Sequence, residues 1–343
     1  MQSLSLLRKC LAVGIILFFI TTAVVPTTAS EKSASRGHWL YVGGNGPGNY
    51  TKIQDAIDHA SAGDTVFVYH DASPYNENIV LDTTLTLLGE NRTTTQISGG
   101  GSPTVAITAP HTVISDFTIT TPTNSTKDQV DGIHGVNCSD ITIKNSTISG
   151  FYYGLSLEKS SGAILEGNTI SFCHSCILIV QSSKIIIHNN TINGTEAIQI
   201  VGGYGTIIDH NNISAVYGIT MFLSLSFDCS SNHFTRCLGA VDCQTTPYGK
   251  IRYNIFQDCE NGILLATTVG MWIVSNTFLN TTHEPEFIDS FFCHWRNNYW
   301  NHPRLFPKII LGTMALPLGF YYALAIPWIN IDWHPAQTPY DTP

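Results

Sequence analysis

Polar and apolar residues alternate along most of this chain, and the alternation returns at a fixed interval. β-Branched side chains stand two positions apart, as at Ile141 and Ile143 or at Ile185 and Ile187, which is the period of a strand rather than of a helix. Each run ends in an asparagine, any residue and then a large apolar residue. The asparagine position recurs in steps of 21 or 22 residues, at Ser146, Asn168, Asn190, Asn211, Asn232, Asn254, Asn276 and Asn298.

A repeat this short cannot bury its own apolar side chains, so its copies must stack on one another. If the chain coils, each strand pairs in parallel with its copy in the next turn, about 4.8 Å away. The asparagines then form a structural ladder, hydrogen-bonded from turn to turn as identical residues are in other in-register stacks. The pattern therefore predicts an all-β fold, a parallel β-helix solenoid.

The segment before the regular turns predicts a capping helix. In TKIQDAIDHA the apolar residues Ile53, Ala56, Ile57 and Ala60 have helical spacing, and the turn AGD and the strand TVFVY follow. Such a helix can cover the open end of the solenoid.

The chain begins with the layout of a secretory signal. Arg8 and Lys9 precede an uncharged apolar run from Cys10 to Val25, and small and hydroxyl residues continue to Ser30. An uncleaved membrane anchor is the alternative. In both cases the remainder faces outside the cytoplasm, where nine N-x-S/T sequons permit glycosylation, at Asn49, Asn91, Asn124, Asn137, Asn145, Asn189, Asn193, Asn212 and Asn280.

Beyond Trp300 the repeat is lost and the chain becomes rich in proline and aromatic residues. Residues 309–329 carry no charge over 21 positions, which is long enough for a membrane span, although Pro317 and Pro327 disfavour a spanning helix. The predicted organisation is a signal peptide at 1–30, a β-helix with its N-terminal cap at 31–303, and a C-terminal cap or hydrophobic anchor at 304–343.

Charge excludes one class of partner. The net charge is −9, and the 16 lysines and arginines are scattered, so no basic patch is available for nucleic acid.

Several segments together resemble a known group of proteins. LYVGGNGPGNYTKIQDAIDHASAGDTVFVY, YNENIVLDTTLTLLGEN, the asparagine-centred turns, NYWNHPRLFPK and PWINIDWHP are similar to archaeal right-handed β-helix surface proteins, grouped with NosD-like and CASH (carbohydrate-binding and sugar hydrolase) repeats. The resemblance covers about residues 38–340 and implies a right-handed solenoid. It also implies either copper delivery or a role among polysaccharide lyases, hydrolases and epimerases, so copper and calcium are the cofactors it leaves open.

One set of candidate catalytic residues follows from the register. Two positions before each ladder residue the side chain should point outward, and Glu166, His188 and Asp209 occupy this position on consecutive turns. They are close enough for acid–base chemistry or metal binding; the alternative is a solvated stripe of mixed charge. The other aspartates form no obvious cluster, and His134 in DGIHG is predicted to lie in a tight turn.

The cysteines suggest two further roles. Cys173, His174 and Cys176 form a compact C-H-x-C group of the soft ligands that copper prefers. Cys237 and Cys259 each lie five residues after a ladder asparagine on adjacent turns, within reach of a disulfide, with stacked thiols or a metal pair as alternatives.

Tyrosines near the turns suggest carbohydrate binding. Tyr152, Tyr153 and Tyr217 could stack on sugars, or they could cover the core. The first hypothesis for function is a cell-surface module that binds a polysaccharide or an envelope component without turnover. A polysaccharide-acting enzyme and a copper-handling protein are the alternatives, and membrane association depends on residues 309–329 or on an uncleaved N-terminus.

Overall fold

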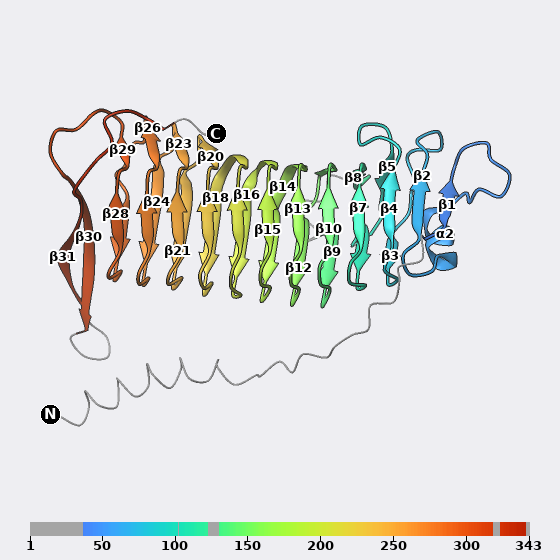
Figure 1. Cartoon of the computed structure of the whole chain (residues 1–343), viewed down its shortest axis with the longest axis horizontal. Helices are drawn as coiled ribbons and strands as arrows, with labels where there is room; N and C mark the ends of the chain where they lie inside the picture. The colour runs from blue at the N-terminus through green and yellow to red at the C-terminus, as the bar shows by residue number, and fades with distance from the viewer. Residues whose placement is uncertain (1–36, 102, 123–129, 318–322, 341–343) are drawn as a thin grey trace, which may run out of the picture. The chain divides into compact units, whose positions relative to one another are not determined.

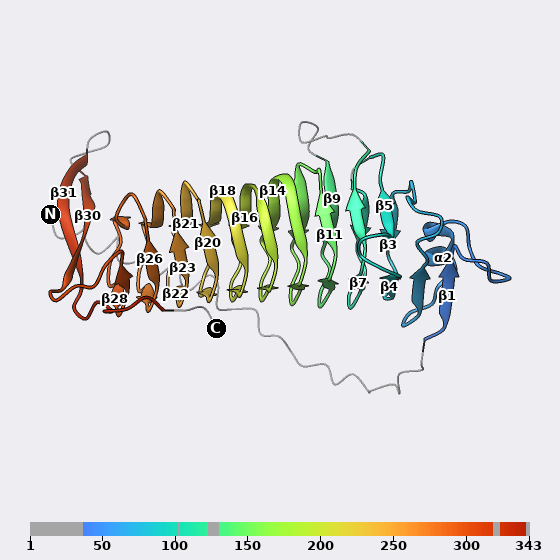
Figure 2. The same cartoon turned by 90° about the horizontal axis from the view of Figure 1, so that it is seen from above.

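The computed structural model describes residues 37–101, 103–122, 130–317 and 323–340. The predicted signal peptide lies outside the described residues. From Trp39 onward the chain coils as a right-handed parallel β-helix of about twelve turns, with strands stacked side by side along one axis (Figures 1 and 2). The sequence-based prediction of the fold is confirmed.

One face of the solenoid is sheet A, a twelve-stranded parallel sheet to which each turn contributes one short strand. In spatial order its strands are β1 (Trp39–Val42), β2 (Thr65–Val68), β4 (Thr86–Gly89), β7 (Val113–Ser115), β10 (Thr142–Lys144), β13 (Ile164–Glu166), β15 (Ile186–His188), β17 (Ile207–Asp209), β19 (Asp228–Ser230), β22 (Lys250–Arg252), β25 (Trp272–Val274) and β28 (His294–Arg296).

The remaining strands form sheet B, which wraps the rest of each turn. Its strands are β3 (Ile79–Leu81), β5 (Gln96–Ser98), β6 (Val105–Ile107), β8 (Thr118–Thr120), β9 (Asp131–Val136), β11 (Thr147–Ser149), β12 (Tyr153–Glu158), β14 (Thr169–Val180), β16 (Thr191–Val201), β18 (Asn212–Phe222), β20 (His233–Thr235), β21 (Gly239–Gln244), β23 (Ile255–Gln257), β24 (Asn261–Ala266), β26 (Thr277–Leu279), β27 (Glu286–Ile288), β29 (Tyr299–Trp300), β30 (Lys308–Pro317) and β31 (Ala323–Asp332).

The asparagine ladder is present at the corner between the two sheets. The backbone N–H of Asn168 donates to Oδ1 of Asn190 at 2.9 Å, and the same bond recurs at each later step. Each ladder amide also donates to a backbone carbonyl of the preceding turn, as Asn190 does to Leu165. All seven asparagines are buried, and because each satisfies several backbone groups, the ladder fixes the register of the turns.

The core repeats in the same way. Aliphatic residues fill the central turns, while Phe234, Phe256, Phe278 and Trp300 form a stack with ring centroids 4.6–5.0 Å apart. Aromatic side chains therefore meet at one strand spacing along the axis.

The N-terminal cap is α2 (Ile53–His59), as predicted. Ile53, Ala56 and Ile57 are buried on the first turns. The Glu77 carboxylate accepts hydrogen bonds from the backbone N–H groups of Ile53 and Gln54 at 2.9 and 3.1 Å, which satisfies free donors at the start of the helix.

The C-terminal segment forms an antiparallel hairpin of β30 and β31, which continues sheet B through the pairing of β30 with β27. Asp332 on β31 is fully buried and ends the ladder: its Oδ2 accepts from the backbone and side-chain amides of Asn298 at 2.9 and 3.1 Å. The described part of residues 309–329 lies in the strands β30 and β31. No helix among the described residues has the length and apolarity to cross a membrane.

Candidate functional site

The predicted outward row lies on sheet A. Strand pairing aligns Glu166 with His188 and His188 with Asp209, so the three residues occupy consecutive turns as expected. Nδ1 of His188 lies 3.1 Å from Oδ1 of Asp209. Glu166 is exposed and takes no part in this contact.

A third residue joins this group and was not predicted. Nδ1 of His210 lies 3.0 Å from Oδ2 of Asp209, and the rings of His188 and His210 stand edge to face at 5.3 Å. We call His188, Asp209 and His210 the sheet A cluster. His210 precedes a ladder asparagine and has a φ of 54°, and this left-handed backbone brings its side chain beside that of Asp209.

A second polar surface runs along sheet B, where each turn bends. Gly132 and Ile133 are both buried, so two successive residues face the core, and the residues on either side of them both face outward. The equivalent positions of later turns follow by register. We call these two rows the bend strip; they comprise Asp131, Tyr153, Ser175, Glu196 and Tyr217, and His134, Ser156, Leu178, Gln199, Thr220 and Asp242. Within the strip Ser156 and Ser175 are buried.

At one end of the bend strip three side chains converge. Oδ2 of Asp131 lies 2.9 Å from Nδ1 of His134 and 2.6 Å from Oγ of Ser156, and the same Nδ1 lies 2.6 Å from that Oγ. We call these residues the bend cluster. The prediction of a tight turn at His134 is wrong, because DGIHGV is the strand β9 and the inward pair within it brings Asp131 and His134 together.

The bend cluster is not a nucleophilic triad. A relay needs the two nitrogens of histidine to contact different partners, whereas Asp131 and Ser156 share Nδ1 of His134. Hydrogen bonding to Asp131 raises the pKa of His134 above its usual value despite partial burial. The cluster therefore holds a charge-assisted hydrogen bond rather than an activated serine.

Farther along the bend strip, Asp242 has one unpaired oxygen. Its Oδ2 accepts from Gln244 at 3.1 Å, while Oδ1 is buried without a partner. Burial raises the pKa of the Asp242 carboxyl group. Ser175 on the same strip also has a buried hydroxyl without a partner.

The predicted tyrosines lie on or beside the bend strip. The rings of Tyr152 and Tyr153 meet edge to face at 4.7 Å, and Tyr152 also lies 4.5 Å from the ring of His174. Tyr217 is 43% exposed and stands three turns from Tyr153 in the same row, about 14 Å along the axis.

The predicted metal group at Cys173, His174 and Cys176 has no geometric support. Cys173 and Cys176 are buried in the core, whereas the ring of His174 lies on the outer side against Tyr152. The pKa of the Cys176 thiol is raised, mainly by its contact with Cys173 and to a smaller extent by burial. Because the chain bends at this point, the thiols and the imidazole face opposite sides of the sheet.

The remaining cysteines pack in the core. Cys237 and Cys259 lie on adjacent turns. The pKa of the Cys259 thiol is raised, mainly by its contact with Cys237 and to a smaller extent by burial. Both are free thiols here, so the disulfide stays a prediction. Cys229 and Cys293 are buried, as expected for inward positions.

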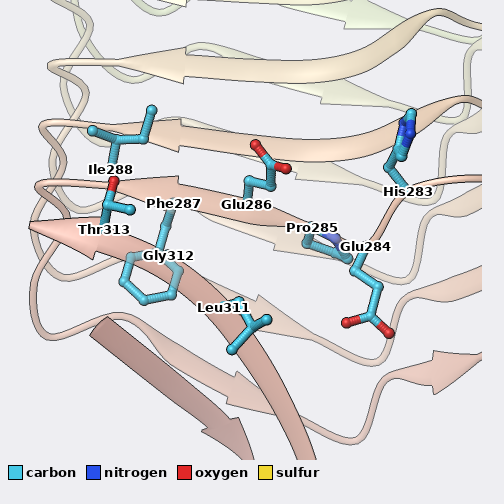
Figure 3. A pocket seen from close by; sticks show the side chains of 9 residues that line it. All are labelled: His283, Glu284, Pro285, Glu286, Phe287, Ile288, Leu311, Gly312 and Thr313. Carbon is cyan, nitrogen blue, oxygen red and sulfur yellow. The ribbon is translucent and has the colours of Figure 1, made fainter. Parts of the chain in front are cut away.

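One hollow of about 530 Å³ lies where β27 meets β30. Figure 3 shows the side chains around it, with Glu286 and Phe287 on one strand and Leu311 and Gly312 on the other. Glu286 is two turns beyond Asp242 in its row, so the hollow adjoins the C-terminal end of that row.

Comparison with known proteins identifies the fold. The family described as "Right handed beta helix region" matches residues 131–278. The chain is similar to the Dettilon tailspike protein (TM-score 0.57, 16% identity), over 72% of this chain and 57% of that one. It therefore spans little more than half of the tailspike.

Two enzymes have similar structures. The A-module of the mannuronan C-5 epimerase AlgE4 from Azotobacter vinelandii has a TM-score of 0.50 and 14% identity, over 70% of this chain and 90% of that one. A DFA-IIIase variant from Arthrobacter chlorophenolicus A6, in complex with DFA-III, has a TM-score of 0.50 and 10% identity, over 80% and 86%. At these identities the likeness establishes the fold, a right-handed parallel β-helix. No curated protein sequence matches the chain.

Proposed function

We propose that this protein binds an extended polysaccharide along the bend strip and does not cleave it. The main support for this proposal is the alignment on consecutive turns of Asp131, Tyr153, Ser175, Glu196 and Tyr217. Aromatic faces stack on sugar rings, and carboxylates accept hydrogen bonds from sugar hydroxyls. The row repeats at a strand spacing of about 4.8 Å, the length scale of a sugar unit.

The unpaired polar atoms support a hydroxyl-rich ligand. Among the described residues Oδ1 of Asp242 has no partner, and a buried acceptor without a donor is costly. A sugar hydroxyl beside Asp242 would supply that donor.

The carboxylate spacing favours binding over hydrolysis. Glycosidases place two carboxyl groups about 5–9.5 Å apart across the scissile bond. Along the described bend strip, Asp131 and Glu196 are three turns apart, about 14 Å. Glu196 and Asp242 are two turns apart and lie in different rows.

The similar structures support the same class of ligand. The epimerase acts on mannuronan by its name. The predicted signal peptide supports export, which would bring the protein to extracellular or cell-surface polysaccharide.

The test is affinity electrophoresis of the full chain through gels containing neutral or acidic polysaccharides, with the polymer length measured afterwards. We expect retention on at least one polymer without shortening. Tyr153→Ala and Tyr217→Ala should each weaken retention about tenfold, equivalent to ~1.4 kcal/mol.

The matched control is Tyr41→Ala. Tyr41 is a 39% exposed tyrosine on β1, within an aromatic patch formed with Trp39, Phe67 and Tyr69. Its loss should leave retention unchanged. Retention that depends on Tyr41 and not on Tyr153 would move the site to sheet A, and shortened polymer would replace the binding function with an enzymatic one.

A further inference from the structure

The sheet A cluster brings three metal-binding groups together on the face that lacks the bend strip. One ligand atom from each of His188, Asp209 and His210 can be chosen so that all three lie within 4.8 Å of one another. Among the described residues this is the one such group of three or more histidine, cysteine or acidic side chains.

The distances fit a coordinated ion. The two imidazole Nδ1 atoms lie 3.1 and 3.0 Å from the two oxygens of Asp209. Ligand atoms bound at about 2.0–2.1 Å to a tetrahedral ion are themselves about 3.3 Å apart. An ion can therefore replace the two hydrogen bonds with small side-chain movements.

The backbone that carries the ligands is held by the ladder. The side-chain amide of Asn190 donates to the carbonyl of His188 at 2.9 Å, and that of Asn211 donates to the carbonyl of Asp209 at 3.0 Å. Both asparagines are buried. Ligands on paired strands with fixed carbonyls need little reorganisation on binding.

The surroundings leave the carboxylate available. The ion pairs of Asp209 within the described chain are those with His188 and His210, and Arg252, two turns away, pairs with Asp228. The side chain of Asp209 is 22% exposed and those of the histidines are 37% and 41% exposed. An ion can enter from solvent and keep water on its open side.

We propose that His188, Asp209 and His210 bind a divalent transition-metal ion, with Zn²⁺ and Cu²⁺ as representative ions. Two imidazoles and one carboxylate suit these ions, whereas Ca²⁺ and Mg²⁺ prefer all-oxygen sites. Glu166 lies in register one turn before His188 and is the nearest additional carboxylate in that row. This site is independent of polysaccharide binding, because His188 and Asp209 lie on sheet A and His210 directly follows β17.

The test is isothermal titration calorimetry of the full chain, free of any histidine tag, with Zn²⁺ and with Cu²⁺. We expect one equivalent of each ion to bind at this site and Ca²⁺ not to bind there. His188→Ala and His210→Ala should each weaken this binding at least about 100-fold, more than the 10–100-fold loss usual for an outer-shell residue. The Cu²⁺ electron paramagnetic resonance spectrum should contain coupling from two imidazole nitrogens.

The matched control is His283→Ala. His283 is also an exposed histidine beside one carboxylate, 3.8 Å from Glu260, and its replacement should leave the affinity unchanged. A Cys173→Ser/Cys176→Ser variant should also retain the site. Binding that survives loss of both His188 and His210, binding that disappears with the cysteines, or absence of a bound equivalent in the unsubstituted protein would each overturn the proposal.

Discussion

The sheet A cluster and the bend cluster both place an aspartate against a histidine, with different results. In the bend cluster one oxygen of Asp131 and one nitrogen of His134 meet the hydroxyl of Ser156, which is 4% exposed. In the sheet A cluster each oxygen of Asp209 meets a different imidazole, and the histidines remain partly exposed.

The difference comes from how the backbone brings the groups together. Asp131 and His134 lie on one strand and meet because the two residues between them face inward. His188 and Asp209 come from neighbouring turns, and His210 is added by a left-handed residue. In the bend cluster the polar groups hydrogen-bond to one another. In the sheet A cluster the nitrogen and oxygen atoms surround a position that a metal ion can occupy.

The largest expected effect comes from the ladder beneath the sheet A cluster. Asn211→Leu removes a donor from the carbonyls of Ile187 and Asp209 and the acceptor of the Asn190 N–H, although the Asp209 carbonyl still accepts from the N–H of Asn189. At about 1 kcal/mol for each of the three lost hydrogen bonds and more for a buried group left unsatisfied, the free energy of unfolding should fall by about 3 kcal/mol in urea denaturation. Zn²⁺ binding should weaken while the pKa of His134 stays unchanged.

The control for this variant is Asn212→Ala, which removes the exposed neighbouring asparagine. It should change stability by less than about 0.5 kcal/mol. Equal losses for the two variants would contradict the dependence of the sheet A cluster on the ladder.

A smaller loss is expected at the bend. A Cβ at Gly132 would lie 2.5 Å from the carbonyl oxygen of Gly154 and 2.8 Å from the ring of Phe151. Gly132→Ala should therefore cost about 1–3 kcal/mol and separate Asp131 from His134. Gly239→Ala is the control substitution, at the outward position of a later turn in the row of Asp131, where the nearest atom is 3.5 Å away, and thermal unfolding should distinguish the two variants.

A third prediction concerns pH. Asp131→Asn removes the hydrogen bond that raises the pKa of His134, so NMR titration should give a lower His134 pKa. Because a raised histidine pKa stabilises the fold below the unfolded pKa and loses that effect as pH rises through the folded pKa, unfolding profiles should differ most on the acidic side. Asp209→Asn should leave the His134 titration unchanged, and a shift there would connect the two clusters.

The smallest effect is expected at Ser156. Ser156→Ala should lower the free energy of unfolding by about 1 kcal/mol, the usual net value of a hydrogen bond. In the unsubstituted protein, Ser156 should not react with fluorophosphonates, which label activated serines. Labelling of Ser156 in the intact-mass spectrum would make the bend cluster catalytic.

The sequence predicted the features of the fold that depend on the register of the asparagine ladder. Once buried asparagines align successive turns, Glu166, His188 and Asp209 must share an outward row, as they do. His210 was not predicted, because it lies one position before the ladder asparagine and not two. The residue directly before the ladder asparagine has a left-handed backbone at Asn189, His210 and Ser231 alike. Because this conformation favours particular residue types, the sequence contained a signal for this position.

The bend in sheet B could not be predicted from the alternation of polar and apolar residues. Two successive inward residues interrupt the period of two, so Asp131 was predicted to be isolated, and Cys173 and His174 to act together. Only the resulting path of the chain places Asp131 against His134 and puts the Cys173 thiol and the His174 ring on opposite sides.

Asp332 limits how a protein of this kind can change its length. An asparagine in the ladder accepts from one neighbour and donates to the next, so duplicating a turn between two asparagines preserves every bond. A carboxylate only accepts, and Asp332 accepts from Asn298, Asn297, Trp300 and the backbone of His334. Duplication of a middle turn therefore preserves the ladder, whereas the ladder ends where Asp332 accepts from Asn298.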